Sequence, residues 1–200
     1  MPIPAKLPLL LSLLLAASRI FAAEAAPSAS ILISVPDQKL AVIQNGMRIA
    51  EYPVSTSRYG VGDRFGSYAT PVGQMAVADK IGQGLPLGAV FKSRHPTGEV
   101  LSPNAPGRDP IVTRILWLRG TEPATRNAYD RDIYIHGTPV ERLIGRPVSY
   151  GCVRMRSRDV AELFQRVSIG TPVEITKTPL RRALSLFALN NPANNAEEKD

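Results

Sequence analysis

Short apolar runs alternate with clusters of turn-forming residues along most of the chain, a pattern typical of β-strands joined by loops. The first run covers residues 31–35 and stops at Pro36-Asp37, a pair that favours a turn. Two more runs, residues 39–44 and 47–54, are separated by Asn45-Gly46, the strongest short-range hairpin signal in a sequence. We therefore expect a β-hairpin early in the folded domain.

The strand pattern continues further along the chain and is interrupted by two long loops. Residues 55–73 are polar and rich in glycine, and residues 81–110 hold ten Gly and Pro residues. A loop excursion as long as the second one is usually functional or mobile in a compact domain. Further strands are expected at residues 74–80, 111–118, 133–135 and 173–175.

Two segments have helical periodicity instead. Ser157 is a candidate N-cap for a helix over residues 158–167, whose apolar positions fall on one face. Residues 180–189 could form a short amphipathic helix, whereas residues 190–200 are polar and expected to be disordered. From the residue pattern alone we predict a mainly β domain with one helix near residues 158–167.

The N-terminal residues have the organisation of a secretory signal peptide. Lys6 precedes an apolar run at residues 7–17, and small residues follow, with Ala23-Glu24-Ala25 as a cleavage site. The apolar run is shorter than the roughly 20 residues that a membrane-spanning helix needs. We expect residues 1–25 to be removed on export, and the alternative is an uncleaved membrane anchor.

Composition and charge fit one exported globular domain. The chain has 200 residues, of which 44% are apolar and 20% charged, so we expect a catalytic or binding domain at residues 26–177 and a partly disordered tail at 178–200. The net charge of +7 suggests an acidic partner. Scattered arginines and only 6% aromatic residues argue against nucleic acid. An anionic envelope polymer and a merely solvated basic surface both stay open.

The soft ligands are few. Cys152 is the single cysteine, which excludes an internal disulfide, and His95 and His136 are the two histidines. A zinc site usually takes three or four Cys, His or carboxylate ligands, so no metal and no cofactor are expected.

A candidate nucleophile and a candidate base lie close in sequence. Cys152 follows His136 by sixteen residues, and a neighbouring imidazole can lower the pKa of a thiol or take its proton. Gly151 permits a sharp turn beside the sulfur, and backbone N–H groups near the following helix could stabilise a thiolate and an oxyanion. The alternative is a small buried cysteine that acts only as an apolar residue.

These residues resemble a known family. The segments Ile135-His136-Gly137-Thr138 and Ser149-Tyr150-Gly151-Cys152-Val153-Arg154-Met155 are similar to the signature of the L,D-transpeptidase catalytic domain, also called YkuD. Val54-Ser55-Thr56 and Thr70-Pro71-Val72-Gly73 also match, so the resemblance runs from about residue 30 to 176. It implies an L,D-transpeptidase-like β-sandwich of mixed sheets with one or two short helices, and the catalytic cysteine at one end.

The resemblance also implies an activity. Family members are cysteine acyltransferases that act on peptidoglycan stem peptides, and Cys152 would form a thioester after release of D-Ala, with His136 as base. An amine from a second stem or from a protein lysine would resolve the thioester. With water as acceptor, the same site would be an L,D-carboxypeptidase or endopeptidase. A non-catalytic wall-binding module is the third reading. The implied location is the periplasm or cell envelope.

Other positions of the signature suggest supporting roles. The backbone of Gly151 and Cys152 could bind an oxyanion. Ser149 could orient the imidazole or stabilise a turn, and Arg154 could hold a substrate carboxylate or form an ion pair that braces the loop. Many family members have a second histidine where this chain has Tyr150, which we interpret as packing or a substrate wall.

The remaining polar residues near the signature are expected to be structural. Gly137 would serve the backbone. The signature does not require Asp130, Asp132 or Glu141, which we expect at the surface or in structural roles. His95 would be solvated, unless residues 81–110 fold over the cleft as a lid and bring it to the substrate.

Overall fold

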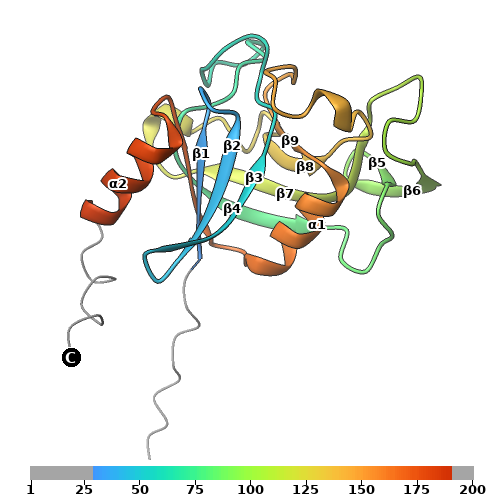
Figure 1. Cartoon of the computed structure of the whole chain (residues 1–200). Coiled ribbons are helices and arrows are strands. Elements are labelled where there is room, and N and C mark those ends of the chain that lie inside the picture. Colours follow the sequence, from blue (N-terminus) through green and yellow to red (C-terminus); the bar gives the residue numbers. More distant parts are fainter. Residues whose placement is uncertain (1–28, 191–200) are drawn as a thin grey trace, which may run out of the picture.

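The computed structural model describes residues 29–190 (Figure 1), and the predicted signal peptide and the end of the tail lie outside this range. Strands dominate, as the sequence predicts. The strands are β1 (Ser30–Ser34), β2 (Lys39–Gln44), β3 (Met47–Pro53), β4 (Gly73–Ile81), β5 (Ala89–Lys92), β6 (His95–Val100), β7 (Ile111–Gly120), β8 (Tyr134–Gly137), β9 (Val153–Met155) and β10 (Pro172–Thr176). The helices are α1 (Ser157–Arg166) and α2 (Leu180–Asn190), with 3-10 turns η1 (Pro123–Thr125) and η2 (Glu141–Leu143).

The strands form one mixed sheet. Its order is β3-β2-β1-β10-β4-β7-β5-β6. Outside this order, β8 also pairs with β7, and β9 pairs with β8. The pairs β1–β10 and β8–β9 are parallel, and the other pairs are antiparallel. β7 is the longest strand and pairs with β4, β5 and β8, so it connects the two halves of the sheet.

The two halves of the sheet pack against each other. β1 to β3 cross the direction of β4 and β7 in Figure 1, and their inward side chains meet those of β7, β8, β9 and α1 in one core. Fully buried members of this core include Ile33, Leu40, Leu116, Ile135 and Leu163. Burial of each such side chain stabilises the fold by about 1.5–3 kcal/mol. The expected mainly β architecture with mixed strand directions is confirmed.

The Asn45-Gly46 hairpin forms as predicted between β2 and β3. Both turn residues have positive φ, 51° and 73°, as a two-residue turn that matches the twist of its strands requires. β8 extends further than expected, because His136 and Gly137 lie inside the strand and not after it.

The expectation that residues 81–110 form a loop excursion is only partly right, because the segment contains the β5–β6 hairpin. Its turn is Ser93-Arg94, with φ values of 48° and 69°. The turn contains no Gly or Asn from which the sequence could predict it. β6 is an exposed edge strand that carries Pro96 and Gly98, residues that an edge tolerates and that hide a strand from pattern analysis.

The prediction that Ser157 caps helix α1 is wrong. Ser157 is the first helical residue, and Arg156 occupies the cap position without a side-chain cap bond. The N–H of Ser157 donates to the Glu141 carboxylate at 2.8 Å, while Thr113 Oγ1 donates to the Ser157 hydroxyl. A negative charge at a helix N-terminus interacts favourably with the helix dipole and stabilises the helix, so Glu141 has a structural role.

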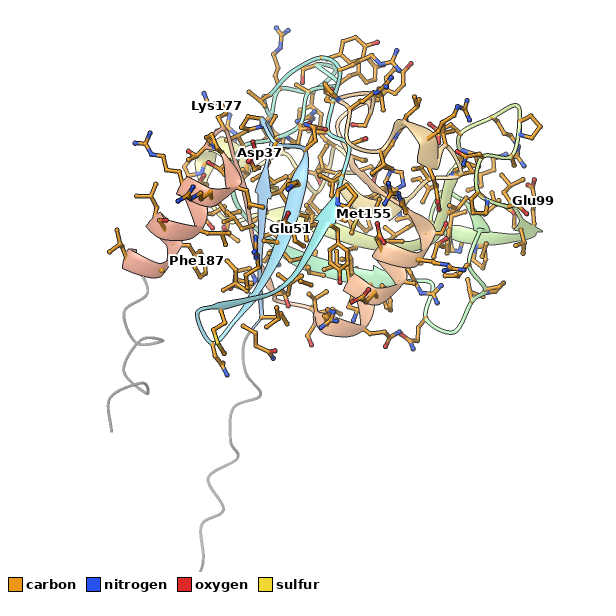
Figure 2. All side chains as sticks on the ribbon, in the orientation of Figure 1. Asp37, Glu51, Glu99, Met155, Lys177 and Phe187 are labelled. Atoms are coloured by element: carbon orange, nitrogen blue, oxygen red, sulfur yellow. The ribbon has the colours of Figure 1, made fainter. Side chains whose placement is uncertain are left out.

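Helix α2 covers the outer face of β1 and β2. Leu180 and Ala183 pack on Leu32, Ala41 and Ile43, and the Leu180 N–H donates to Asp37 Oδ2 at 2.6 Å. Phe187, labelled in Figure 2, adds to this contact from the last turn of the helix. Within residues 29–190, no helix is both long and apolar enough to cross a membrane.

Candidate active site

The signature residues gather on the outer face of β7, β8 and β9. In the strand register, His136 lies opposite Ile115 on β7 and opposite Arg154 on β9. Paired residues project to the same face, whereas their neighbours Ile135 and Val153 project into the core. Because successive side chains of a strand point to opposite faces, the site residues lie on one face of the sheet and the core residues on the other.

Cys152 lies just before β9 and reaches the same outer face. The backbone N–H of Tyr134 donates to the Cys152 sulfur at 3.4 Å, and the thiol donates to the backbone carbonyl oxygen of Asp132 at 3.3 Å. The sulfur packs beside an apolar cluster of Phe91, Ile115 and Tyr134 and is half-buried. A thiol in this position is held by two backbone groups.

The strand register places Cys152 and His136 as diagonal neighbours. Tyr134 contacts the sulfur, and His136 follows two residues later on the same face. With about 3.3 Å per residue and about 4.8 Å between strands, such diagonal positions are about 8 Å apart at their Cα atoms. Aromatic and long side chains at diagonal positions of neighbouring strands are within reach of one another.

The His136 ring has a defined proton arrangement. Its Nδ1 lies 2.8 Å from the carbonyl oxygen of Gly137, and since a carbonyl only accepts, Nδ1 carries the proton. The lone pair is then on Nε2, the nitrogen that can receive a proton. Burial, with only 6% of the residue exposed, lowers the pKa of His136 to about 4, so the ring is neutral at physiological pH.

Gly137 permits the close packing beside this histidine. A Cβ at Gly137 would lie 2.6 Å from the carbonyl oxygen of Val112 and 3.2 Å from the Val160 side chain. No larger residue fits without separating β8 from β7 and α1. Gly137 is therefore suited to a backbone role, because β7, β8 and α1 meet closely at this position.

The thiol is also neutral in the resting site. Burial raises the pKa of Cys152 to about 11, and the Tyr134 N–H and the charge of Arg154 only partly offset this. In the sequence, β9 and Arg156 stand between Cys152 and the start of helix α1. At physiological pH the resting site therefore holds a neutral thiol at Cys152 and a neutral imidazole at His136.

The turn before Cys152 contains both hydrogen-bonded and unbonded polar groups. Ser149 Oγ donates to the Cys152 carbonyl oxygen at 2.6 Å and accepts from the Gly151 N–H at 3.3 Å. Ser149 thus stabilises the turn and is directed at the backbone, not at His136. Within residues 29–190 the Cys152 N–H has no hydrogen-bond partner, so it is the better oxyanion donor of the two expected backbone groups.

Gly151 adopts a conformation that favours glycine. Its φ is 122°, and a Cβ there would lie 3.2 Å from the Ile133 side chain. The buried Thr70 hydroxyl donates to the Gly151 carbonyl oxygen at 2.9 Å and accepts from the Ser57 N–H. The Thr70-Pro71-Val72-Gly73 stretch thereby holds the turn that presents the thiol.

Arg154 forms an ion pair across the site. Its guanidinium lies 2.6 Å from Asp109 Oδ2, and Asp109 Oδ1 accepts from the Thr138 hydroxyl at 2.6 Å. The Arg154 side chain is largely buried, with 12% exposed, whereas 29% of the Asp109 side chain is exposed, so the pair is partly shielded from solvent. In this structure the guanidinium therefore braces residues 81–110 against β9, the second of the two roles considered from the sequence.

Tyr150 lies in an exposed aromatic cluster beside the nucleophile. Its ring is 5.6 Å from that of Tyr59 and 6.0 Å from that of Tyr68, and the Arg58 guanidinium lies 5.1 Å from its centre. About half of each tyrosine is exposed. An aromatic wall next to Cys152 can contact a bound peptide, and the ring has no link to His136.

Two remaining sequence candidates lie at the surface. His95 is exposed on β6, and Asp130 is exposed in the loop before β8. The neighbour of His95, Arg94, is the residue that reaches the site. Within residues 29–190, no group of three or more His, Cys, Asp or Glu side chains could hold a metal ion.

Sequence reasoning missed three residues that shape the site, Arg94, Asp109 and Tyr134. It named a fourth, Asp132, only as a surface or structural residue. The sequence could have predicted the place of Tyr134, because it precedes His136 by two positions in a strand and must share its face. Asp109 and Arg94 have none, since their partners come from distant parts of the chain.

Known proteins resemble this chain. The family model of the L,D-transpeptidase catalytic domain, YkuD, matches residues 28–175. The chain is 28% identical over 168 residues to the protein named Probable L,D-transpeptidase YcfS of Escherichia coli (strain K12), covering 78% of this chain and 46% of that protein. It is 45% identical over 47 residues to Probable L,D-transpeptidase YbiS of the same strain, covering 24% of this chain and 15% of that protein.

The chain spans about half or less of the length of these curated relatives. Among solved structures, an L,D-transpeptidase from Mycobacterium tuberculosis H37Rv aligns with 76% of this chain and 58% of its own, at 20% identity and a TM-score of 0.49. Because the family model covers well over half of the residues, the chain belongs to the L,D-transpeptidase catalytic-domain family, YkuD.

Proposed function

We propose that this protein is an exported cysteine acyltransferase, an L,D-transpeptidase that acts on peptidoglycan stem peptides. The observation that carries the proposal is the shared outer face of β8 and β9. There, a half-buried thiol at Cys152 lies diagonally from a neutral imidazole whose Nδ1 is bound to the Gly137 carbonyl. This is the arrangement that nucleophilic acyl transfer needs, because the base must be unprotonated and fixed.

The first half of the reaction would form a thioester. Cys152 Sγ attacks the carbonyl between the diamino acid and the terminal D-Ala, and the thiol proton passes to His136 Nε2. The oxyanion that forms is stabilised by the Cys152 N–H, which is free in this structure. When the C–N bond breaks, the imidazolium returns the proton to the departing amine, and D-Ala leaves.

The second half would consume the thioester. An amine of a second stem peptide, or of a protein lysine, attacks the acyl carbon and gives a proton to His136 Nε2. The C–S bond breaks, the sulfur takes the proton back, and a new amide remains. A neutral imidazole suits both halves, since it accepts a proton in each and returns it.

The acceptor defines the alternative function. With water in place of the amine, the same steps give an L,D-carboxypeptidase or an endopeptidase. A non-catalytic wall-binding module is disfavoured by the tautomer fixed on His136 and by the free Cys152 N–H, which binding alone does not need.

Location and partners follow from the same proposal. Residues 1–25 would direct export to the periplasm or cell envelope, where stem peptides are found, and the basic net charge of +7 suits an anionic polymer. The catalytic domain would correspond to residues 26–177. Tyr150 and its neighbours would form one wall of the groove for the stem peptide.

Product analysis separates these functions. The purified protein is incubated with a stem tetrapeptide, with and without an amine acceptor, and Cys152→Ala serves as the control. Release of D-Ala with formation of an acceptor-linked product supports transpeptidation, and tripeptide without linked product supports hydrolysis. The absence of any product from a folded sample contradicts both enzyme functions.

A further inference from the structure

The Cys152 sulfur is held by a small polar network that does not include His136. The thiol donates to the Asp132 carbonyl oxygen, and the adjacent Tyr134 N–H donates to the sulfur. The side chains of the same two residues bond to each other, with Tyr134 Oη donating to Asp132 Oδ1 at 2.6 Å. Both groups that hold the sulfur thus come from one short segment, residues 132–134.

Asp132 has an unusual backbone that needs support. Its φ is 55°, in the left-handed region that few residues other than glycine, asparagine and aspartate adopt. This conformation turns the Asp132 carbonyl toward the sulfur while the chain enters β8. The position of the thiol acceptor therefore depends on the contacts that fix the Asp132 side chain.

Those contacts come from the turn of the β5–β6 hairpin. Arg94 donates to Asp132 Oδ1 at 2.9 Å and to Tyr134 Oη at 3.0 Å. Its guanidinium also stacks over the Trp117 ring, 4.4 Å from the ring centre, and Trp117 packs edge-on against Tyr134. A guanidinium held by two oxygens and an aromatic face has a fixed geometry, which a lysine would not reproduce.

We propose that Arg94 and Asp132 are positioning residues, and that their ion pair lets the β5–β6 hairpin fix the carbonyl group that holds and aims the Cys152 thiol. In the intact network the Asp132 carbonyl retains the thiol proton until substrate arrives. Loss of the network frees the sulfur to rotate and to contact water. The part of this inference that concerns acyl transfer rests on the proposed function.

Other charges act on the sulfur and define what the test must separate. Arg154 and Arg131 favour the thiolate, and Asp132 disfavours it. Arg94 is one step further away, behind Asp132 and Tyr134, and the neutral His136 lies diagonally across the strands. If Arg94 acted only as a charge, its removal would disfavour the thiolate. If it acts through position, its removal favours the thiolate, so at Arg94 the two effects have opposite signs. At Asp132 the loss of charge and the loss of position both favour the thiolate, so the sign measured at Arg94 decides.

The test compares Arg94→Ala, Arg94→Lys and Asp132→Asn in the full chain. Asparagine tolerates the left-handed backbone and keeps a bond to Tyr134, so this variant removes mainly the charge. Glu99→Gln is the matched control, because it breaks the Arg108–Glu99 ion pair at the outer edge of the same hairpin (Figure 2). Thermal unfolding establishes that each variant is folded.

Two rates are measured for each protein. The first is alkylation of Cys152 by iodoacetamide from pH 6 to 10, which needs no peptide substrate. We expect Arg94→Ala and Asp132→Asn to react about tenfold faster at neutral pH, the effect of a thiol pKa that falls by about one unit. The second is acylation by a stem tetrapeptide. We expect it to slow about tenfold in the same two variants, because the sulfur is no longer held in one orientation. Arg94→Lys should be intermediate, and Glu99→Gln should behave as wild type.

Three outcomes would overturn the proposal. Alkylation profiles of Arg94→Ala and Asp132→Asn that match Glu99→Gln would show that the network does not hold the sulfur. Slower alkylation would show that Arg94 acts only as a charge. Slower acylation with unchanged alkylation would place Arg94 on the substrate. Failure of the wild type to be acylated would contradict the proposed function, while the alkylation profile would still decide the positioning role.

Discussion

His136 and Arg154 are paired directly in the β8–β9 ladder, where Arg154 forms an ion pair with Asp109 and the imidazole bonds the carbonyl of Gly137. A cation beside a buried histidine disfavours its protonation, and Asp109 offsets part of this effect. The pair therefore adds to burial in keeping the base neutral, which is the state in which it can accept the thiol proton.

The nucleophile is tested by substitution at Cys152. We expect Cys152→Ala to abolish turnover and to leave the fold intact, because the side chain is half-buried and makes only two weak sulfur bonds. Cys152→Ser should lose several orders of magnitude in kcat, since a hydroxyl is far less easily ionised than a thiol. Steady-state kinetics with circular dichroism measure both properties. A serine variant with most of the wild-type rate would refute thiol catalysis.

The pH dependence of turnover tests the protonation states. With the pKa of His136 lowered to about 4 and that of Cys152 raised to about 11, the neutral pair persists between these values. We expect kcat/KM to be flat from about pH 6 to about pH 9 and to fall only at lower pH, as the base is protonated.

His136→Gln provides the comparison for this profile. It should reduce kcat/KM by about 10²–10⁴-fold, the usual contribution of a positioned base. An acid limb centred near pH 6.5 in the wild type would contradict a buried neutral imidazole and would favour a thiolate–imidazolium pair.

Protein stability should also depend on His136. Its pKa is lower in the folded state than the 6.5 of an unperturbed histidine, so the unfolded chain binds more protons between pH 6.5 and 4. The stabilisation is fully present above pH 6.5, and about 3 kcal/mol of unfolding free energy is lost as the pH falls through this range. Urea unfolding at several pH values measures the slope.

A matched pair of variants identifies the source of that slope. His136→Gln should remove it, whereas His95→Gln should retain it, because His95 is exposed on β6. Equal slopes in the two variants would show that His136 is not the group responsible.

The Arg154–Asp109 pair should contribute to stability and to the base. Asp109→Asn leaves the Arg154 charge largely buried without its counter-ion, and we expect unfolding free energy to fall by about 1–3 kcal/mol. The pKa of His136 should fall further, because the negative charge of Asp109 raises it.

Glu99→Gln is again the control, since it breaks an exposed ion pair that is worth about 0.2–1 kcal/mol. Denaturant melts and histidine NMR titration give the two quantities. A loss in Asp109→Asn no larger than in Glu99→Gln would show that the pair does not brace the site.

The parts of this molecule that sequence analysis predicts are those encoded locally. Asn45-Gly46 supplies the two positive φ values of its turn, and the His136 and Cys152 motifs are short and contiguous. β1, β2, β4 and β7 appear as apolar runs because each has a side in the core. These features need no knowledge of distant residues.

The parts that it misses depend on distant contacts. The β5–β6 turn uses Ser93-Arg94 in a backbone conformation that neither residue announces. Arg94 finds Asp132 thirty-eight residues later. The helix cap of α1 comes from Glu141 and not from the adjacent serine, because Ser157 bonds Thr113 instead. Such choices are decided by packing, which a single sequence does not show.

The role of Cys152 is tested most directly by mass spectrometry of the intact protein after exposure to a stem tetrapeptide or a carbapenem. We expect a covalent acyl adduct that peptide mapping places on Cys152, that is absent from Cys152→Ala and that forms much more slowly in His136→Gln. A folded wild-type protein that gains no mass, or an adduct on another residue, would contradict the claim that this thiol is the nucleophile.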